Sequence, residues 1–93
     1  MYEHYKKATL MMGTPSLGAL RDEVGELISD RSAEELCDVI HTLARLARLP
    51  SGVVWVIAHS TAKKHAERVA LRGCPRSERS CREADEACCC RVG

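Results

Sequence analysis

Residues 20–43 read LRDEVGELISDRSAEELCDVIHTL, and this stretch decides the fold that the sequence predicts. Apolar residues recur every three or four positions on both sides of a polar break at 29–32, which is the spacing of amphipathic helices. Ser32, followed three residues later by Glu35, is a capping-box pattern that begins the second helix. A break this short joins antiparallel neighbours, so the stretch predicts a helical hairpin.

The helical pattern continues on both sides of this hairpin. Gly13 and Gly73 stand where two further helices should stop, because glycine favours the residue after a helix end. The run VVWVIA at 53–58 is apolar on all sides, so a β-strand is an alternative there. We favour a helix because the sequence continues to residue 72 without a break signal. The expected helices cover 2–12, about 15–28, Ser32 to about Leu49, and 51–72.

The composition is that of one small domain. The chain has 93 residues, of which 45% are hydrophobic and 3% aromatic, and it has no phenylalanine. The core must then come from aliphatic residues, which favours packed helices over a sandwich or barrel. A domain of this size buries only about 60–65% of its unfolded surface, so its core is marginal without help. We expect an all-α small helical bundle, built on the antiparallel hairpin and completed by homo-oligomerisation to a homodimer or homotetramer.

Aliphatic residues nearly vanish after Gly73. The segment 74–93, CPRSERSCREADEACCCRVG, holds five of the six cysteines. We predict a single helical domain over 1–73 and a Cys-rich, poorly ordered tail over 74–93. The tail cysteines are separated by six residues or are adjacent, unlike the C-x2-C spacing of zinc knuckles. The pattern therefore favours free thiols over a zinc or redox cluster.

Charge and hydropathy limit the kinds of partner that the chain can bind and the cellular compartment that we expect for it. The formal net charge of +1 gives no bulk attraction for nucleic acid or for an anionic membrane. The basic segment 63–72 lacks the aromatic residues that stack on bases, so nucleic-acid binding is disfavoured. No apolar run approaches the ~20 residues of a membrane span, and the N-terminus mixes charges where a signal peptide is apolar. We expect a cytoplasmic protein without a membrane partner.

Two acidic pairs on the predicted hairpin carry the chemistry. Glu23 with Glu26, and Glu35 with Asp38, are each three residues apart, so each pair presents two carboxylates on one helix surface. Each pair is rotated in the same sense from its apolar stripe, so the four carboxylates converge or diverge together. If they converge, a hard divalent cation relieves their repulsion, and oxygen ligands favour Mg²⁺ over zinc. The sequence leaves both arrangements open.

A plainer interpretation applies to the same residues. Thirteen acidic residues in the chain make pairs at this spacing common, and exposed helix faces are often acidic for solubility alone. Glu35 also has a competing structural role as the capping partner of Ser32. His41 follows Asp38 by three residues, and we interpret it as an exposed helix histidine.

The segment DEVGEL followed by EELCDVI resembles the MazG-like, all-α nucleoside triphosphate pyrophosphohydrolases. Their signature is E-x-x-E on one helix and E-x-x-D on the next, and the resemblance covers about residues 15–48. Glu23, Glu26, Glu35 and Asp38 fall on the four signature positions. The resemblance implies Mg²⁺ held by these carboxylates, and hydrolysis of a nucleotide between its α- and β-phosphates to a monophosphate and pyrophosphate.

Members of this superfamily hold phosphate with basic residues on a later helix. Lys63, Lys64 and Arg68 are candidates for that role by their position. The resemblance thus implies a hydrolase acting on acid anhydrides, in which one of the glutamates is a possible general base. Two other interpretations stay open: a non-enzymatic helical module that oligomerises through VVWVIA, and, with less support, a nucleic-acid-binding module.

Overall fold

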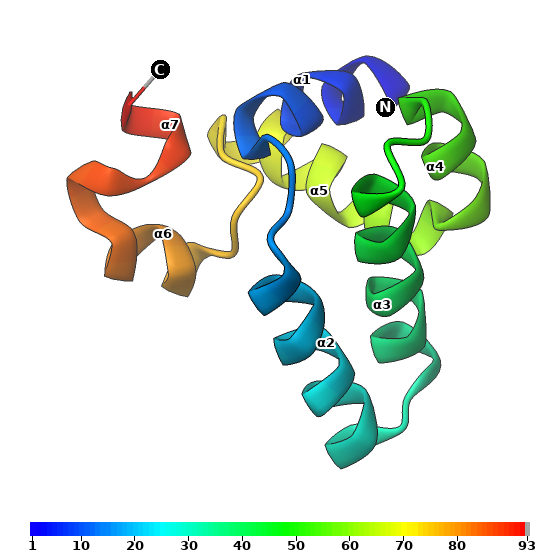
Figure 1. The fold of residues 1–93 in the computed structure, drawn as a ribbon. Coiled ribbons are helices and arrows are strands. Elements are labelled where there is room, and N and C mark those ends of the chain that lie inside the picture. Colours follow the sequence, from blue (N-terminus) through cyan, green and yellow to red (C-terminus); the bar gives the residue numbers. More distant parts are fainter. Residues whose placement is uncertain (93) are drawn as a thin grey trace. The chain divides into compact units, whose positions relative to one another are not determined.

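The computed structural model describes residues 1–92, and every regular element in that range is helical. The strand alternative at 53–58 is therefore wrong, and the all-α prediction is confirmed for the described residues. The elements in chain order are α1 Tyr2–Met12, α2 Leu17–Asp30, α3 Ala33–Leu46, α4 Ser51–Ile57, α5 His59–Arg72, α6 Glu78–Ala84, the 3-10 helix η1 Asp85–Ala87 and α7 Cys89–Val92 (Figure 1).

The chain divides into two compact units. The central unit is Thr14–Ala62, and the terminal unit joins Met1–Gly13 to Lys63–Gly93. Helix α5 begins in the central unit and continues into the terminal unit. The domain boundary predicted at Gly73 falls inside the terminal unit.

Local capping sets the bounds of the two central helices. The Ser16 hydroxyl accepts a hydrogen bond from the Ala19 amide at 3.1 Å, so α2 begins two residues after the predicted start at Pro15. Arg31 adopts the left-handed conformation with φ 50°, and its amide donates to the Leu27 carbonyl, which ends α2. Ser32 then caps α3, as predicted. The two helices pack along each other in the central unit (Figure 1).

The single helix predicted over 51–72 is wrong, because the structure has two helices there. Ala58 departs from helical geometry, with φ −125° and ψ 44°, between α4 and α5. In a continuous helix the Trp55 carbonyl would accept from the backbone amide of residue 59. Here the side-chain Nδ1 of His59 lies 3.2 Å from that carbonyl oxygen. A local side-chain contact therefore accompanies the break, and no glycine or proline marks it in the sequence.

The core of the central unit lies where α3, α4 and the start of α5 contribute small residues. Val39, Ala44, Val54 and Ala58 are buried there, and His41 is only 4% exposed. The expectation of an exposed His41 is therefore wrong. Several large apolar residues of the predicted helices lie at the surface instead; among them are Leu17, Val24, Ile28, Leu36, Leu43 and Val56.

In the terminal unit, Tyr5 and Ala8 of α1 and Ala66 and Val69 of α5 are buried. Gly13 and Gly73 follow α1 and α5 with φ 67° and 70°, which confirms the two predicted helix stops. The sequence predicted a poorly ordered segment after Gly73, whereas the structure places α6, η1 and α7 there. Among the described residues, no helix combines the length and the apolar character that crossing a membrane requires.

Candidate metal centre

Three carboxylates meet in the central unit. Glu23 of α2, together with Glu35 and Asp38 of α3, each offers one oxygen, and these oxygens lie within 4.8 Å of one another. All three side chains are half-buried. We call these residues the carboxylate cluster. The two helices that the sequence predicted to be neighbours thus turn their acidic flanks toward each other.

The local structure of α3 explains why Glu35 is available to this cluster. The Ser32 hydroxyl accepts a hydrogen bond from the Glu35 amide at 3.1 Å, so Ser32 makes its half of the predicted capping box. The Glu35 carboxylate points toward other acids, because its electrostatic neighbours include Asp38, Glu26 and Asp30. The competing role that the sequence assigned to the Glu35 side chain does not remove it from the cluster.

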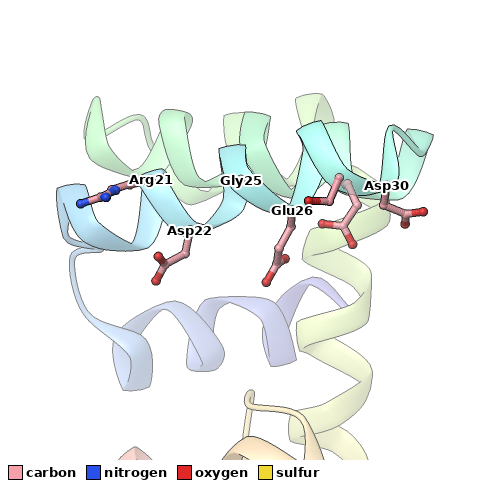
Figure 2. A pocket seen from close by; sticks show the side chains of 7 residues that line it. Arg21, Asp22, Gly25, Glu26 and Asp30 are labelled. Carbon is pink, nitrogen blue, oxygen red and sulfur yellow. The ribbon is translucent and has the colours of Figure 1, made fainter.

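Glu26 lies outside the trio but beside Glu35. Its exposed side chain lines an open hollow of about 750 Å³ together with Glu35. Figure 2 shows Asp22 and Glu26 projecting from the same side of their helix, with Asp30 beyond them near its end. The full set of lining residues is Arg21, Asp22, Gly25, Glu26, Ser29, Asp30 and Glu35. Four acids against one arginine make the hollow strongly negative.

The electrostatics of Glu35 follow from this crowding. Partial burial, followed by the charges of Asp38 and Glu26, raises the pKa of Glu35 above its ordinary value. One oxygen of Glu23 and one of Glu35 are shielded from solvent, and the shielded Glu35 Oε2 accepts no hydrogen bond within the described residues. An ionised carboxylate in that position gains from a cation that replaces its lost hydration.

Thr61 is a contributor that the sequence analysis missed. Its hydroxyl, at the start of α5, donates a hydrogen bond of 2.7 Å to Asp38 Oδ1. Thr61 is only 3% exposed, so the bond is sheltered and fixes one oxygen of Asp38. Residues 38 and 61 are 23 positions apart. No periodic pattern links residues so distant in the chain, so the sequence offered no signal for this contact.

The donor set fits a hard divalent cation. Three carboxylates supply only oxygen, which suits Mg²⁺, Mn²⁺ or Ca²⁺ and lacks the nitrogen and sulfur ligands typical of zinc. With Mg–O distances of about 2.1 Å, two oxygens on one ion lie about 3–4 Å apart, so the cluster needs only small side-chain rotations. Three protein ligands leave further positions of an octahedral ion for water or phosphate oxygens.

The basic residues predicted to bind phosphate lie on the later part of α5, in the terminal unit. Lys63 Nζ lies 3.9 Å from Glu67 Oε1, and Arg68 donates to the Pro75 carbonyl at 3.5 Å. Lys64 is half-buried. A role of these residues in phosphate binding stays a prediction.

Comparison of the chain with protein-family models, with curated proteins and with solved structures found no match.

Proposed function

We propose that the chain is a Mg²⁺-dependent nucleotide pyrophosphohydrolase. It would cleave a nucleoside or deoxynucleoside triphosphate between the α- and β-phosphates and release a monophosphate and pyrophosphate. The observation that supports this most is the convergence of Glu23, Glu35 and Asp38, with Glu26 beside them at the wall of an open hollow. The choice of reaction rests on the resemblance of residues 15–48 to the signature of the MazG-like pyrophosphohydrolases.

In this proposal α2 and α3 form an antiparallel hairpin whose facing carboxylates, Glu23, Glu35 and Asp38, hold the ion. When bound, Mg²⁺ supplies charge neutralisation for the phosphates and lowers the pKa of a coordinated water. An acidic hollow repels a triphosphate by itself, so substrate binding should depend on the cation.

The exposed position of Glu26 suits a different role from that of the trio. It lies beside Glu35 at the open side of the cluster, where solvent and substrate have access. A carboxylate there is placed to take a proton from the attacking water, and we assign Glu26 the role of general base. Thr61 acts as a positioning residue, because its hydroxyl holds one oxygen of Asp38.

The proposal includes self-association in the cytoplasm as a homodimer or homotetramer. Leu17 is 77% exposed, Ile28 65% and Val56 72%, and these residues lie on two helices of the central unit, α2 and α4. Covering such residues contributes about 25 cal/mol for each Å² of apolar surface removed from water. The same exposure favours the second candidate function, a non-enzymatic oligomerisation module.

The deciding experiment compares Glu35→Gln with Glu34→Gln. Both substitutions remove one charge from the first turn of α3, so they have similar effects on the helix, but only Glu35 belongs to the cluster. We expect Glu35→Gln to lower Mg²⁺-dependent pyrophosphate release on the order of 100-fold, and Glu34→Gln to change it less than about twofold. The substrates are a panel of ribo- and deoxyribonucleoside triphosphates.

Two outcomes would reject the enzyme. One is equal turnover by the two variants, and the other is the absence of Mg²⁺-dependent turnover in the parent protein across the whole panel. If the parent is inactive yet forms a stable oligomer without Mg²⁺, the oligomerisation module is the better description. Sedimentation of the parent and of Val56→Lys, with and without Mg²⁺, measures that directly.

A further inference from the structure

Four cysteine sulfurs gather in the terminal unit. Cys74, Cys81, Cys88 and Cys90 each place their Sγ within 4.8 Å of the other three. Cys74, Cys81 and Cys88 are buried, and Cys90 is half-buried. We call these four residues the thiol cluster.

The sulfur separations match those around a single tetrahedral ion. Cys74 and Cys88 are 3.4 Å apart, Cys88 and Cys90 are 3.5 Å apart, and Cys81 and Cys90 are 3.8 Å apart. Zinc–sulfur bonds of about 2.3 Å in tetrahedral geometry hold sulfurs about 3.8 Å apart. A disulfide would need about 2.05 Å, and all four residues are free cysteines.

The backbone brings these residues together although their spacing in sequence is irregular. Gly73, with φ 70°, ends α5 and turns the chain at Cys74. Asp85, with φ 49°, reverses it again between the helix that carries Cys81 and the one that carries Cys90. The Arg91 guanidinium then bridges the two sides, because it donates to the carbonyls of Cys81 at 3.2 Å and Asp85 at 2.6 Å.

The hydrophobic cluster that the segment forms from its own residues is small. The hydrophobic cluster of the segment consists of Cys74, Cys81 and Cys88, with Ala84, Cys89 and Cys90 packed against it. No leucine, isoleucine, phenylalanine or methionine occurs between residues 74 and 91. Segments this short that lack a large core usually require a metal or a disulfide to fold. Structural zinc sites supply such stabilisation, since metal binding and folding are coupled.

We propose that the thiol cluster binds one Zn²⁺ ion in a closed tetrahedral site that fixes the fold of residues 74–91. Four soft thiolates favour zinc over Mg²⁺, and four protein ligands leave no position for a substrate. The site is therefore structural. The sequence favoured free thiols because the cysteines do not follow C-x2-C spacing. In the folded chain the same cysteines nevertheless lie close together.

The first test measures zinc binding by the whole chain. The protein is purified under reducing conditions, freed of metal with a chelator, and titrated with Zn²⁺ or with Co²⁺ as a coloured substitute. We expect one ion per chain, with the visible absorption of tetrahedral cobalt coordinated by thiolates. Bound zinc should also protect four of the six thiols from alkylation.

Cys89 supplies a matched control, because it is adjacent to two ligands but lies outside the cluster. We expect Cys90→Ser to weaken zinc binding about 100-fold or more, and Cys89→Ser to change it less than about threefold. The amide NMR spectrum of residues 74–91 should become dispersed on zinc addition in the parent and in Cys89→Ser. Because Cys74→Ser removes a different ligand, it should reproduce the loss seen with Cys90→Ser.

Several results would overturn the proposal. Zinc binding equally weakened by Cys89→Ser and Cys90→Ser would show that no particular set of four thiols is used. Iron taken up in preference to zinc would assign a different ion. If residues 74–91 are equally well ordered without metal, zinc has no structural role. If Cys74 and Cys88 form a disulfide in the presence of excess zinc, the four thiols are not a zinc site.

Discussion

The carboxylate cluster and the thiol cluster have the same spread, since the donor atoms of each lie within 4.8 Å of one another. They differ in three ways that decide what each can do. The carboxylates are hard, three in number and half-buried, and one of them, Glu35, lines an open hollow, whereas the thiols are soft, four in number and mostly buried. An incomplete oxygen shell leaves room for water and substrate, while a complete sulfur shell does not. Proximity of ligands alone therefore does not distinguish a catalytic centre from a structural one.

The largest expected effect tests whether metal binding and catalysis can be separated at the carboxylate cluster. We expect Glu26→Gln to lower kcat about 100-fold or more while the Mg²⁺ concentration that gives half-maximal rate stays unchanged. The physical reason is that Glu26 lies outside the trio that we propose as the ligands of the ion. Steady-state rates across a Mg²⁺ titration make the measurement, with Asp22→Asn as the control from the same hollow. A shift in Mg²⁺ dependence equal to the loss of rate would make Glu26 a ligand.

A smaller effect should follow from loss of the Thr61–Asp38 hydrogen bond. Thr61→Val keeps the shape of the side chain but removes the hydroxyl that donates at 2.7 Å to Asp38. We expect Mg²⁺ affinity to fall about 10-fold, in line with the usual effect of residues that orient metal ligands. Thr61→Ser retains the donor and should recover most of the affinity. Equal behaviour of the two variants would show that only packing matters at this position.

The sequence predicted the residues of the carboxylate cluster but not the thiol cluster. Both outcomes follow from the fact that sequence patterns report local structure. Helical periodicity and caps are local, so Gly13, Ser32 and Gly73 marked helix ends that the structure confirms. The same periodicity paired the acids on each helix but left open which way the hairpin turned. A side-chain contact made by His59 accompanies the break at Ala58, and no glycine or proline marks that break in the sequence.

Contacts between distant residues explain what the sequence missed. The Thr61–Asp38 hydrogen bond joins residues 23 positions apart, and the Cys74–Cys88 contact joins residues 14 positions apart. Contacts of this kind depend on the fold and not on local periodicity. Spacing rules for zinc sites assume that neighbouring ligands come from one short loop. Here the ligands come from a helix end, a helix and two positions around a 3-10 turn, so those rules pointed away from the cluster.

The smallest expected effect is a pH dependence of stability, and it concerns Glu35 of the carboxylate cluster. The pKa of Glu35 is raised in the folded state, chiefly by burial, so the folded protein holds its proton at a pH where the unfolded chain has released it. Glu35 therefore lowers the stability of the metal-free protein as pH rises from the ordinary glutamate range through the raised pKa. Below the ordinary glutamate pKa this penalty is absent.

Glu35→Gln isolates this contribution. We expect the variant to gain stability relative to the parent as pH rises from about 4 to 7 in a chelator, because it carries no charge to repel. Thermal denaturation of both proteins across that range measures the difference. Mg²⁺ should reduce the gap at pH 7, and a gap that is constant with pH would contradict the raised pKa.

The most direct test of the two-site account is metal content after dialysis against Zn²⁺ and Mn²⁺ together, with Mn²⁺ standing in for Mg²⁺. Elemental analysis is made on the parent, on Glu35→Gln and on Cys90→Ser. We expect the parent to hold both metals, Glu35→Gln to lose manganese and keep zinc, and Cys90→Ser to lose zinc and keep manganese. Loss of both metals from either variant, or of neither from both, would contradict two independent centres with different ligand chemistry.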